Sequence, residues 1–147
     1  MSVTTATEFD TESRATLAAL ADVLVPEAEG MPAASQVDVQ GKWVDRVLRV
    51  RPDLAAELAR VLGAARGREP IAEVARLQQE DAEGFAVLAL AVTGAYYLHP
   101  RVRKLIGYPG QKKNPPYPDE ADYYLRDGLV DPVVARGPIY RPTPSAE

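Results

Sequence analysis

The amino-acid sequence predicts an all-α protein: a small bundle of about five helices, followed by an extended C-terminal arm rich in proline and tyrosine. Three observations lead to this prediction. Apolar residues recur at helical spacing through most of the first two thirds of the chain. No stretch alternates apolar and polar residues over the length of a strand. The segment 107–147 holds eight of the thirteen prolines and five of the seven tyrosines.

The first half of the bundle is expected to contain two helices separated by a loop. Residues 11–25 place leucines at helical spacing, with Thr11 as the predicted N-cap and Pro26 as the stop. Small residues, glycine and proline over residues 27–35 indicate a loop. Residues 37–50 then predict a second helix, although a glycine inside it weakens the helical preference.

The second half of the bundle follows the same pattern. Residues 52–66 predict a third helix with proline in its first turn and Gly67 just past its end. The connection is short, so we expect the second and third helices to be antiparallel. Residues 70–77 predict a short helical segment. Residues 78–97 predict a long helix that is apolar nearly all round, which places it at the centre of the bundle.

Proline and large apolar residues occur together in the C-terminal segment. Proline removes a backbone donor and disfavours long helices, so we expect one short helix over residues 118–126 and extended or turning chain elsewhere. The retained apolar residues argue against a solvated tail. We therefore divide the chain into a flexible N-terminus (1–10), a helical body (11–106) and an arm that wraps a partner (107–147).

Composition limits the possible functions. The chain has 147 residues, 46% of them hydrophobic and 26% charged, with a net charge of −4, so nucleic acid is not expected as a partner. It contains no cysteine and a single histidine, which excludes cysteine-ligated metals and multi-histidine sites. The most apolar stretch, residues 85–98, is too short to insert across a membrane. The N-terminal residues do not resemble a signal peptide, so a cytoplasmic location is expected.

Two groups of residues are candidates for proton-transfer chemistry. His99 titrates near neutrality, but it precedes Pro100, and a hydrogen-bonding role at a helix end is the favoured interpretation. Glu80, Asp81 and Glu83 resemble a carboxylate site, yet their position at the start of the long helix favours a role in stabilising the helix terminus. We therefore predict no catalytic, cofactor-binding or metal-binding residue.

Aromatic and basic residues near and within the arm are the predicted partner-binding set. Tyrosine and arginine are common anchors of protein interfaces, because they bring large contact area and directed hydrogen bonds. A local run of basic residues around 101–113 favours docking to a protein over binding phosphate. The predicted partner-binding residues are Arg101, Arg103, Tyr108, Tyr117, Tyr123, Tyr124, Leu129, Ile139 and Tyr140.

Two short blocks resemble a known family. Leu17-Ala-Ala-Leu-Ala-Asp22-Val-Leu-Val-Pro26, with Gly30-Met-Pro32-Ala-Ala34 and Val37-Asp-Val39, is similar to the opening of the gluconate 2-dehydrogenase subunit 3 family. Thr93-Gly94-Ala-Tyr-Tyr-Leu-His-Pro100, leading into Leu105-Ile-Gly107-Tyr-Pro-Gly110, is similar to that family's later block. The resemblance covers roughly residues 17–110. It implies a helical small subunit whose large partner is a glucose–methanol–choline oxidoreductase that holds FAD and the catalytic residues.

Three functional hypotheses follow. The favoured one is a non-catalytic small subunit that binds and stabilises a larger FAD-dependent sugar or alcohol oxidoreductase subunit. The second is a small stand-alone enzyme that uses His99 with a carboxylate such as Asp119 or Asp122. The third is a self-associating helical scaffold whose arm is exchanged between copies.

Overall fold

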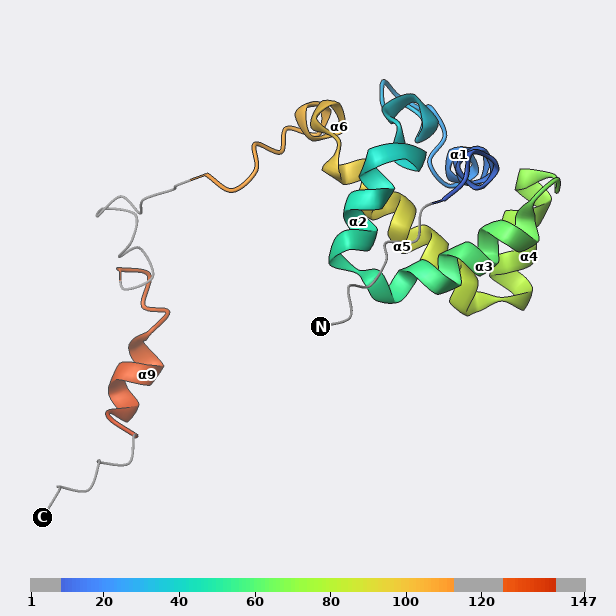
Figure 1. Ribbon diagram of the computed structural model, residues 1–147. Helices are drawn as coiled ribbons and strands as arrows, with labels where there is room; N and C mark the ends of the chain where they lie inside the picture. The colour runs from blue at the N-terminus through green and yellow to red at the C-terminus, as the bar shows by residue number, and fades with distance from the viewer. Residues whose placement is uncertain (1–8, 113–125, 140–147) are drawn as a thin grey trace, which may run out of the picture. The chain divides into compact units, whose positions relative to one another are not determined.

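The computed structural model describes residues 9–112 and 126–139. These residues form helices that are joined by loops and turns. The chain divides into two compact units, Met1–Gly110 and Gln111–Glu147. The described part contains no strand beyond an isolated bridge between Ala28 and Met31. The predicted all-α class and small bundle are confirmed (Figure 1). The helices are α1 (Thr11–Leu24), α2 (Val44–Val50), α3 (Ala55–Ala65), α4 (Pro70–Glu80), α5 (Ala82–Leu98), α6 (Pro100–Leu105) and α9 (Asp131–Arg136).

Asp10, rather than the predicted Thr11, caps α1. The backbone N–H of Ser13 donates to the Asp10 carboxylate at 2.7 Å, which satisfies one of the free donors at the helix start. Arg66 holds the same carboxylate from the end of α3, at 2.8 Å. The Ser13 and Arg66 hydrogen bonds lower the pKa of Asp10 to about 2. Sequence reasoning placed the cap one residue late because threonine is also a good cap.

The second predicted helix is broken in its first half. A 3₁₀ turn, Ser35–Val37, ends at Asp38, whose φ of 54° lies in the left-handed region that aspartate tolerates. A π-helical turn, Val39–Trp43, follows and contains a non-helical Gly41. Only then does α2 begin. The loop and these turns are tied to the body where the Tyr96 hydroxyl donates to the Pro32 carbonyl at 2.7 Å.

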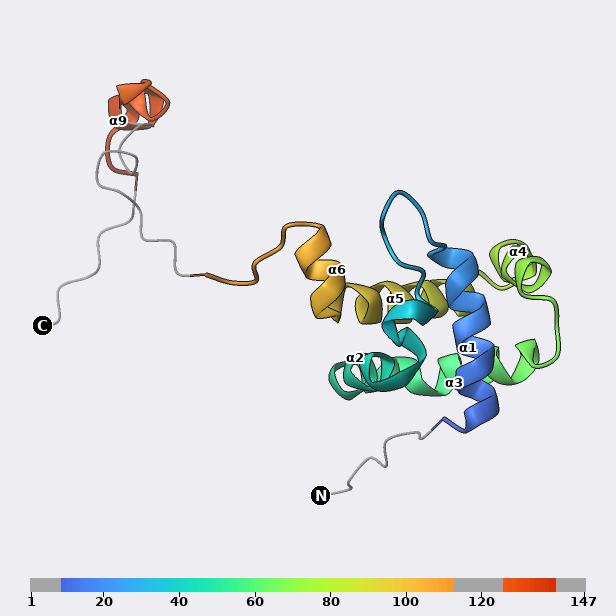
Figure 2. The same ribbon diagram turned by 90° about the horizontal axis from the view of Figure 1, so that it is seen from above.

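The expected antiparallel pairing of the second and third helices is wrong. Figures 1 and 2 show α2 crossing the direction of α3, with the 3₁₀ turn Pro52–Leu54 at the corner. Each of the two helices packs against α5 instead. On the α2 side, Val47 approaches α5 at Gly94, where an added Cβ would lie 3.3 Å from a valine methyl carbon. A small residue at this point therefore allows the two backbones to come close.

Asp81 separates α4 from α5, four residues later than the break that the sequence predicted. Its side chain accepts from the backbone N–H of Gly84 at 3.0 Å and from Arg60 of α3 at 2.6 Å. The favoured structural interpretation of Asp81 is confirmed. These two interactions lower the pKa of the Asp81 carboxyl, the Arg60 hydrogen bond being the larger cause.

The core forms around α5, as predicted for a helix that is apolar nearly all round. Helices α1, α2, α3, α4 and α6 all contact it. No described helix has the length and apolar character needed to cross a membrane. The largest fully buried side chains are Leu17, Leu20, Leu58, Leu62, Leu77, Leu88, Val37, Val39, Val44, Val61, Val92 and Val102.

The arm differs from its prediction within residues 126–139. This segment was expected to be extended or turning, but Asp131–Arg136 forms the short helix α9. Pro132 lies in the first turn, where a missing N–H breaks no helical hydrogen bond. Gly137, with a φ of 70°, follows its end. The short helix predicted over 118–126 lies outside the described residues except for Arg126, and the predicted flexible N-terminus lies outside them except for Phe9 and Asp10.

Replacing Leu88 by alanine should destabilise the body by about 2–5 kcal/mol, because the side chain is fully buried in α5 and its loss leaves a cavity. Leu90→Ala on the same helix is the matched control, since Leu90 is 45% exposed and its truncation should cost less than about 1 kcal/mol. Urea unfolding followed by circular dichroism measures both values. Equal losses for the two variants would contradict the central position of α5.

Candidate partner-binding surface

The nine predicted partner-binding residues fall into three groups. Arg101, Arg103 and Tyr108 lie at the C-terminal end of the first unit, in and just after α6. Leu129 and Ile139 flank α9 in the second unit. Tyr117, Tyr123, Tyr124 and Tyr140 lie outside the described residues.

His99 joins α5 to α6 and caps the shorter helix. The backbone N–H of Arg101 donates to its Nδ1 at 3.1 Å. Pro100 follows as the first residue of α6, where proline is preorganised for a helix start. The predicted hydrogen-bonding role of His99 at a helix end is confirmed. Because Nδ1 accepts, the proton of the neutral ring is on Nε2.

The His99 ring is held against the π-helical turn of the body. Its centroid lies 5.3 Å from that of Trp43, edge to face, and the Lys42 ammonium lies 4.9 Å from the Trp43 ring centroid. Desolvation is the main cause that lowers the pKa of His99 below its ordinary value, and Lys42 and Arg101 lower it further. The neutral ring is therefore favoured, which preserves the Nδ1 acceptor that caps α6.

The end of α6 is closed by two backbone hydrogen bonds. The N–H of Gly107 donates to the carbonyl of Lys104 at 3.1 Å, and the N–H of Tyr108 donates to the carbonyl of Arg103 at 2.8 Å. This pair forms a Schellman motif, with Gly107 at a φ of 70°. The turn at Gly107 is therefore the C-terminal cap of α6.

The Schellman motif brings two of the predicted partner-binding residues together. It places the Tyr108 ring beside the Arg103 guanidinium, with 5.1 Å between Cζ and the ring centroid. Gly110 covers the guanidinium from another direction, because a Cβ added there would lie 2.6 Å from Arg103 Nη2. Arg103 is half-buried as a result, whereas Arg101 and Lys104 are exposed.

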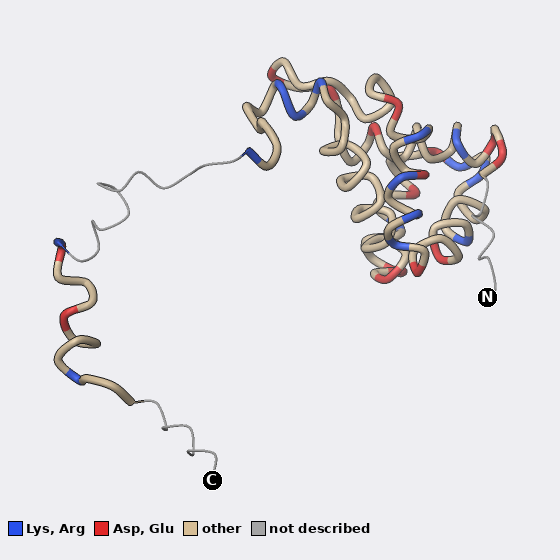
Figure 3. Tube along the Cα trace, turned by 60° about the vertical axis from the view of Figure 1, so that its left-hand side comes forward, with Lys and Arg blue, Asp and Glu red and all other residues tan. Residues whose placement is uncertain are grey.

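The basic residues of α6 form no ion pair within the described segments, whereas most arginines in the rest of the body do. Arg14 pairs with Asp45, Arg60 with Asp81, and Arg66 with Asp10. By contrast, Arg101, Arg103 and Lys104 form no ion pair with any acidic residue in the two described segments. Blue segments, which mark Lys and Arg, lie at the end of the body from which the chain runs on to the grey trace (Figure 3). The end of the body is therefore locally positive although the chain as a whole is negative.

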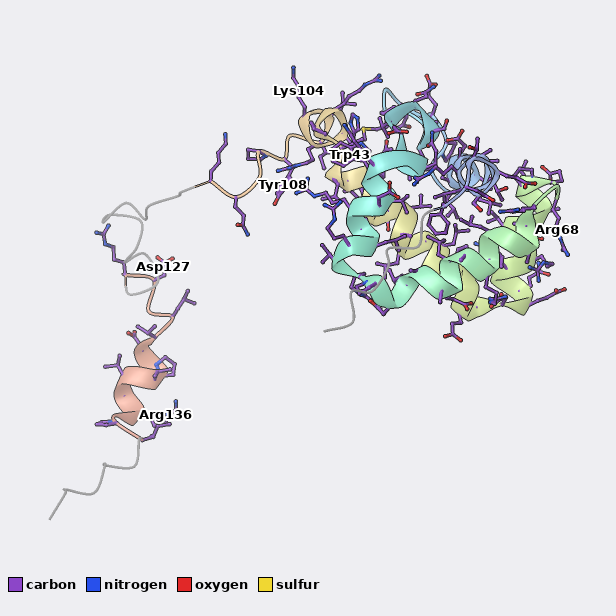
Figure 4. All side chains as sticks on the ribbon, viewed as in Figure 1. Trp43, Arg68, Lys104, Tyr108, Asp127 and Arg136 are labelled. Carbon is purple, nitrogen blue, oxygen red and sulfur yellow. The ribbon has the colours of Figure 1, made fainter. Side chains whose placement is uncertain are left out.

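Large apolar side chains are exposed beside these cations. Tyr97, at the end of α5, is 55% exposed, and Leu105 and Ile106 are each about half exposed. Figure 4 places Trp43, Lys104 and Tyr108 at this same end of the body. Sequence reasoning missed Leu105 and Ile106, although a basic run followed by two aliphatic residues was a visible signal. We call this the α6 surface, formed by Tyr97, Arg101, Arg103, Lys104, Leu105, Ile106 and Tyr108.

In the second unit, the apolar side chains of the described segment are also uncovered. Leu129 is 66% exposed, Val134 is 71% exposed and Ile139 is 72% exposed. No residue of α9 is buried. The described part of the arm thus carries apolar groups that its own helix does not shield from water.

Nothing in the described part assembles a reaction centre around His99. Its Nδ1 is used by the backbone, and Asp119 and Asp122, the carboxylates considered for pairing with it, lie outside the described residues. Residues 9–112 and 126–139 bring together no cluster of potential metal ligands. A shallow hollow of about 230 Å³ between α1, the end of α3 and the start of α4 is lined by small and aliphatic side chains with Arg68. It presents neither histidine nor carboxylate.

Comparisons with protein-family models, with curated proteins and with solved structures gave no match to this chain. The resemblance to the gluconate 2-dehydrogenase subunit 3 family therefore stays a prediction. The fold and the α6 surface are established by the chain's own geometry.

Replacing His99 by asparagine should make stability less sensitive to pH between about pH 7 and pH 5. The folded pKa of His99 is below its unfolded value of about 6.5, so the unfolded chain takes up a proton first. This contribution to the stability of the native state is fully present above the unfolded pKa of about 6.5. It is lost as the pH falls through the folded pKa of His99. Asparagine can still cap α6 but does not titrate.

Because His99 is the sole histidine, no other side chain of ordinary pKa titrates in that window. The melting temperatures of the native and His99→Asn proteins are compared by thermal unfolding across this pH range. Parallel pH profiles for the native and His99→Asn proteins would show that His99 does not couple protonation to folding.

Proposed function

We propose that this chain is a non-catalytic small subunit that binds and stabilises a larger FAD-dependent sugar or alcohol oxidoreductase subunit. In this proposal the chain itself holds no cofactor, and FAD with the catalytic residues belongs to the partner. The sequence resemblance to small subunits of glucose–methanol–choline type dehydrogenases supplies the class of partner. Exposed apolar side chains of the chain give a physical reason for it to bind a partner.

One observation carries the proposal: large apolar side chains are uncovered on the α6 surface and in the arm. Burying such groups is the main favourable term in protein association, at about 25 cal/mol per Å² of apolar surface. Tyr97 and Tyr108 in the first unit and Leu129 and Ile139 in the second are each more than half exposed. A partner that covers both sets would gain contact area without unfolding the helical core.

Proline supports the same role for the arm. An arm rich in proline loses less conformational freedom on binding than a flexible one, so more of the contact energy remains as affinity. Tyrosine adds wide contact area with a polar tip. The arm is therefore suited to lying along a larger protein.

Purification of the full-length chain at its native expression level tests the proposal. A protein several times larger should co-purify and carry flavin, visible as a yellow complex whose absorbance follows this chain through size exclusion. Adding the small subunit back to the separated flavoprotein should raise the latter's melting temperature, since a ligand of the native state stabilises it by mass action.

The matched control is a chain that lacks residues 111–147, the second unit. It should keep the helical circular dichroism of the body while losing association, because its core lies within the first unit. The proposal fails if the full-length chain is isolated without flavoprotein and converts a sugar or alcohol unaided. The role assigned to the arm fails if the shortened chain binds with undiminished affinity.

A further inference from the structure

The Arg103 side chain lies between the Tyr108 ring and Gly110. The Schellman motif ties the backbone of Tyr108 to that of Arg103, and the Tyr108 ring then lies 5.1 Å from the guanidinium carbon. Gly110 closes the other approach, since even one added carbon there would lie 2.6 Å from Nη2. A long flexible side chain held this way has already lost part of its rotamer freedom, so less is lost on binding.

The fixed guanidinium keeps its hydrogen-bonding capacity. Within the described residues it donates no hydrogen bond and forms no ion pair, whereas Arg60 and Arg76 use theirs on carboxylates of this chain. A guanidinium presents its N–H donors as a planar fork that matches the two oxygens of a carboxylate. The Arg103 guanidinium thus presents N–H donors that have no hydrogen-bond acceptor in the described part of the chain.

The charges around Arg103 also favour an anion. Arg101 and Lys104 lie on the same short helix, and Lys42 and Arg101 each lower the pKa of His99 by more than Asp38 raises it. None of the three α6 cations forms an ion pair with an acidic residue of the described segments. A positive field of this kind steers an acidic group toward the surface and raises its rate of association.

The apolar neighbours indicate that the anion belongs to a protein. Leu105, Ile106 and Tyr108 are about half exposed near the cations, and a surface that combines large apolar side chains with arginine is typical of protein interfaces. A polyanion such as nucleic acid would meet a chain of net charge −4. A lipid surface is usually bound by a longer amphipathic helix than α6, which has six residues.

We infer that Arg103, ordered by Tyr108 and Gly110, binds a carboxylate of an acidic segment of the partner subunit, with Arg101 and Lys104 as flanking cations. This inference rests on the proposed function and specifies the chemistry of the partner's contact. Leu105 and Ile106 pack against apolar residues next to that carboxylate. The pairing is bidentate, so lysine at position 103 does not replace arginine.

The first test uses the full chain and two synthetic peptides, and it does not require the flavoprotein. One N-acetylated peptide alternates glutamate and tyrosine, and the other has glutamine in place of every glutamate. The chain is labelled with ¹⁵N, and the Arg103 Nε–H signal is followed during titration. The glutamate peptide should shift this signal with saturation, and the glutamine peptide should bind at least about tenfold more weakly.

Arg103→Lys should weaken binding of the glutamate peptide by about tenfold, because the charge stays while the fork is lost. Gly110→Ala should weaken it as well, because the added Cβ displaces the guanidinium and strains a backbone whose φ is 82°. The matched control is Arg49→Lys, the same exchange at an exposed arginine of α2 that has no ion pair in the described segments. Its affinity should stay within about twofold of the native chain.

The inference is overturned if Arg103→Lys binds the glutamate peptide as tightly as the native chain, or if the two peptides bind equally. It is also overturned if inorganic phosphate, or vesicles of phosphatidylcholine with phosphatidylserine, shift the Arg103 signal at equal or lower concentration. The same variants are then measured in the purified flavoprotein complex. If the complex forms normally with Arg103→Lys, the proposed function stands and only the role assigned to Arg103 is refuted.

Discussion

The packing of other helices around α5 is the constraint on which this structure depends. A helix that is apolar nearly all round is stable only when most of its surface is buried, and α1, α2, α3, α4 and α6 all pack against it. The caps and ion pairs serve that packing. Asp81 fixes the start of α5 against α3, and the Tyr96 hydroxyl fixes its last turns against the loop at Pro32. Buried side chains thus hold the helical body together, and polar contacts fix the ends of its helices relative to one another.

The same packing also determines which apolar side chains of α5 stay exposed. The surrounding helices leave a stripe of α5 uncovered, including Leu90 and Tyr97, seven residues apart on one face. Tyr97 belongs to the α6 surface, where the cations form no ion pair with an acidic residue of the described segments. Apolar exposure and unpaired positive charge therefore meet at one end of the body, which is where an interface gains most from both.

Periodicity was sufficient to predict α1, α3 and α5, because their apolar residues recur without interruption. It failed at Asp38, where a left-handed residue and a π-helical turn replace continuous helix. That break depends on contacts between segments, such as the hydrogen bond that Arg14 of α1 donates to the Gln40 carbonyl at 2.8 Å. Proline was weighted too heavily in the arm, since Pro132 in a first turn is compatible with α9.

The candidate site was predicted in its residue types but not in its arrangement. Arg101, Arg103 and Tyr108 could be named from composition, and Gly107 indicated a turn. The stacking of Arg103 on Tyr108 followed only from the Schellman motif, which requires the exact end of α6 to be known. Some arginine pairs of the body are local in the sequence, such as Arg60 with Glu57 and Arg76 with Glu73. Others, such as Arg14 with Asp45 and Arg66 with Asp10, depend on tertiary distances that no sequence pattern encodes.

The proposed function requires the apolar groups of the arm to be covered by a partner and not by the chain itself. Amide hydrogen exchange over residues 126–139, compared between the isolated chain and the flavoprotein complex, tests this requirement most directly. Fast exchange is expected in the isolated chain and strong protection in the complex. Equal protection in both states would contradict it.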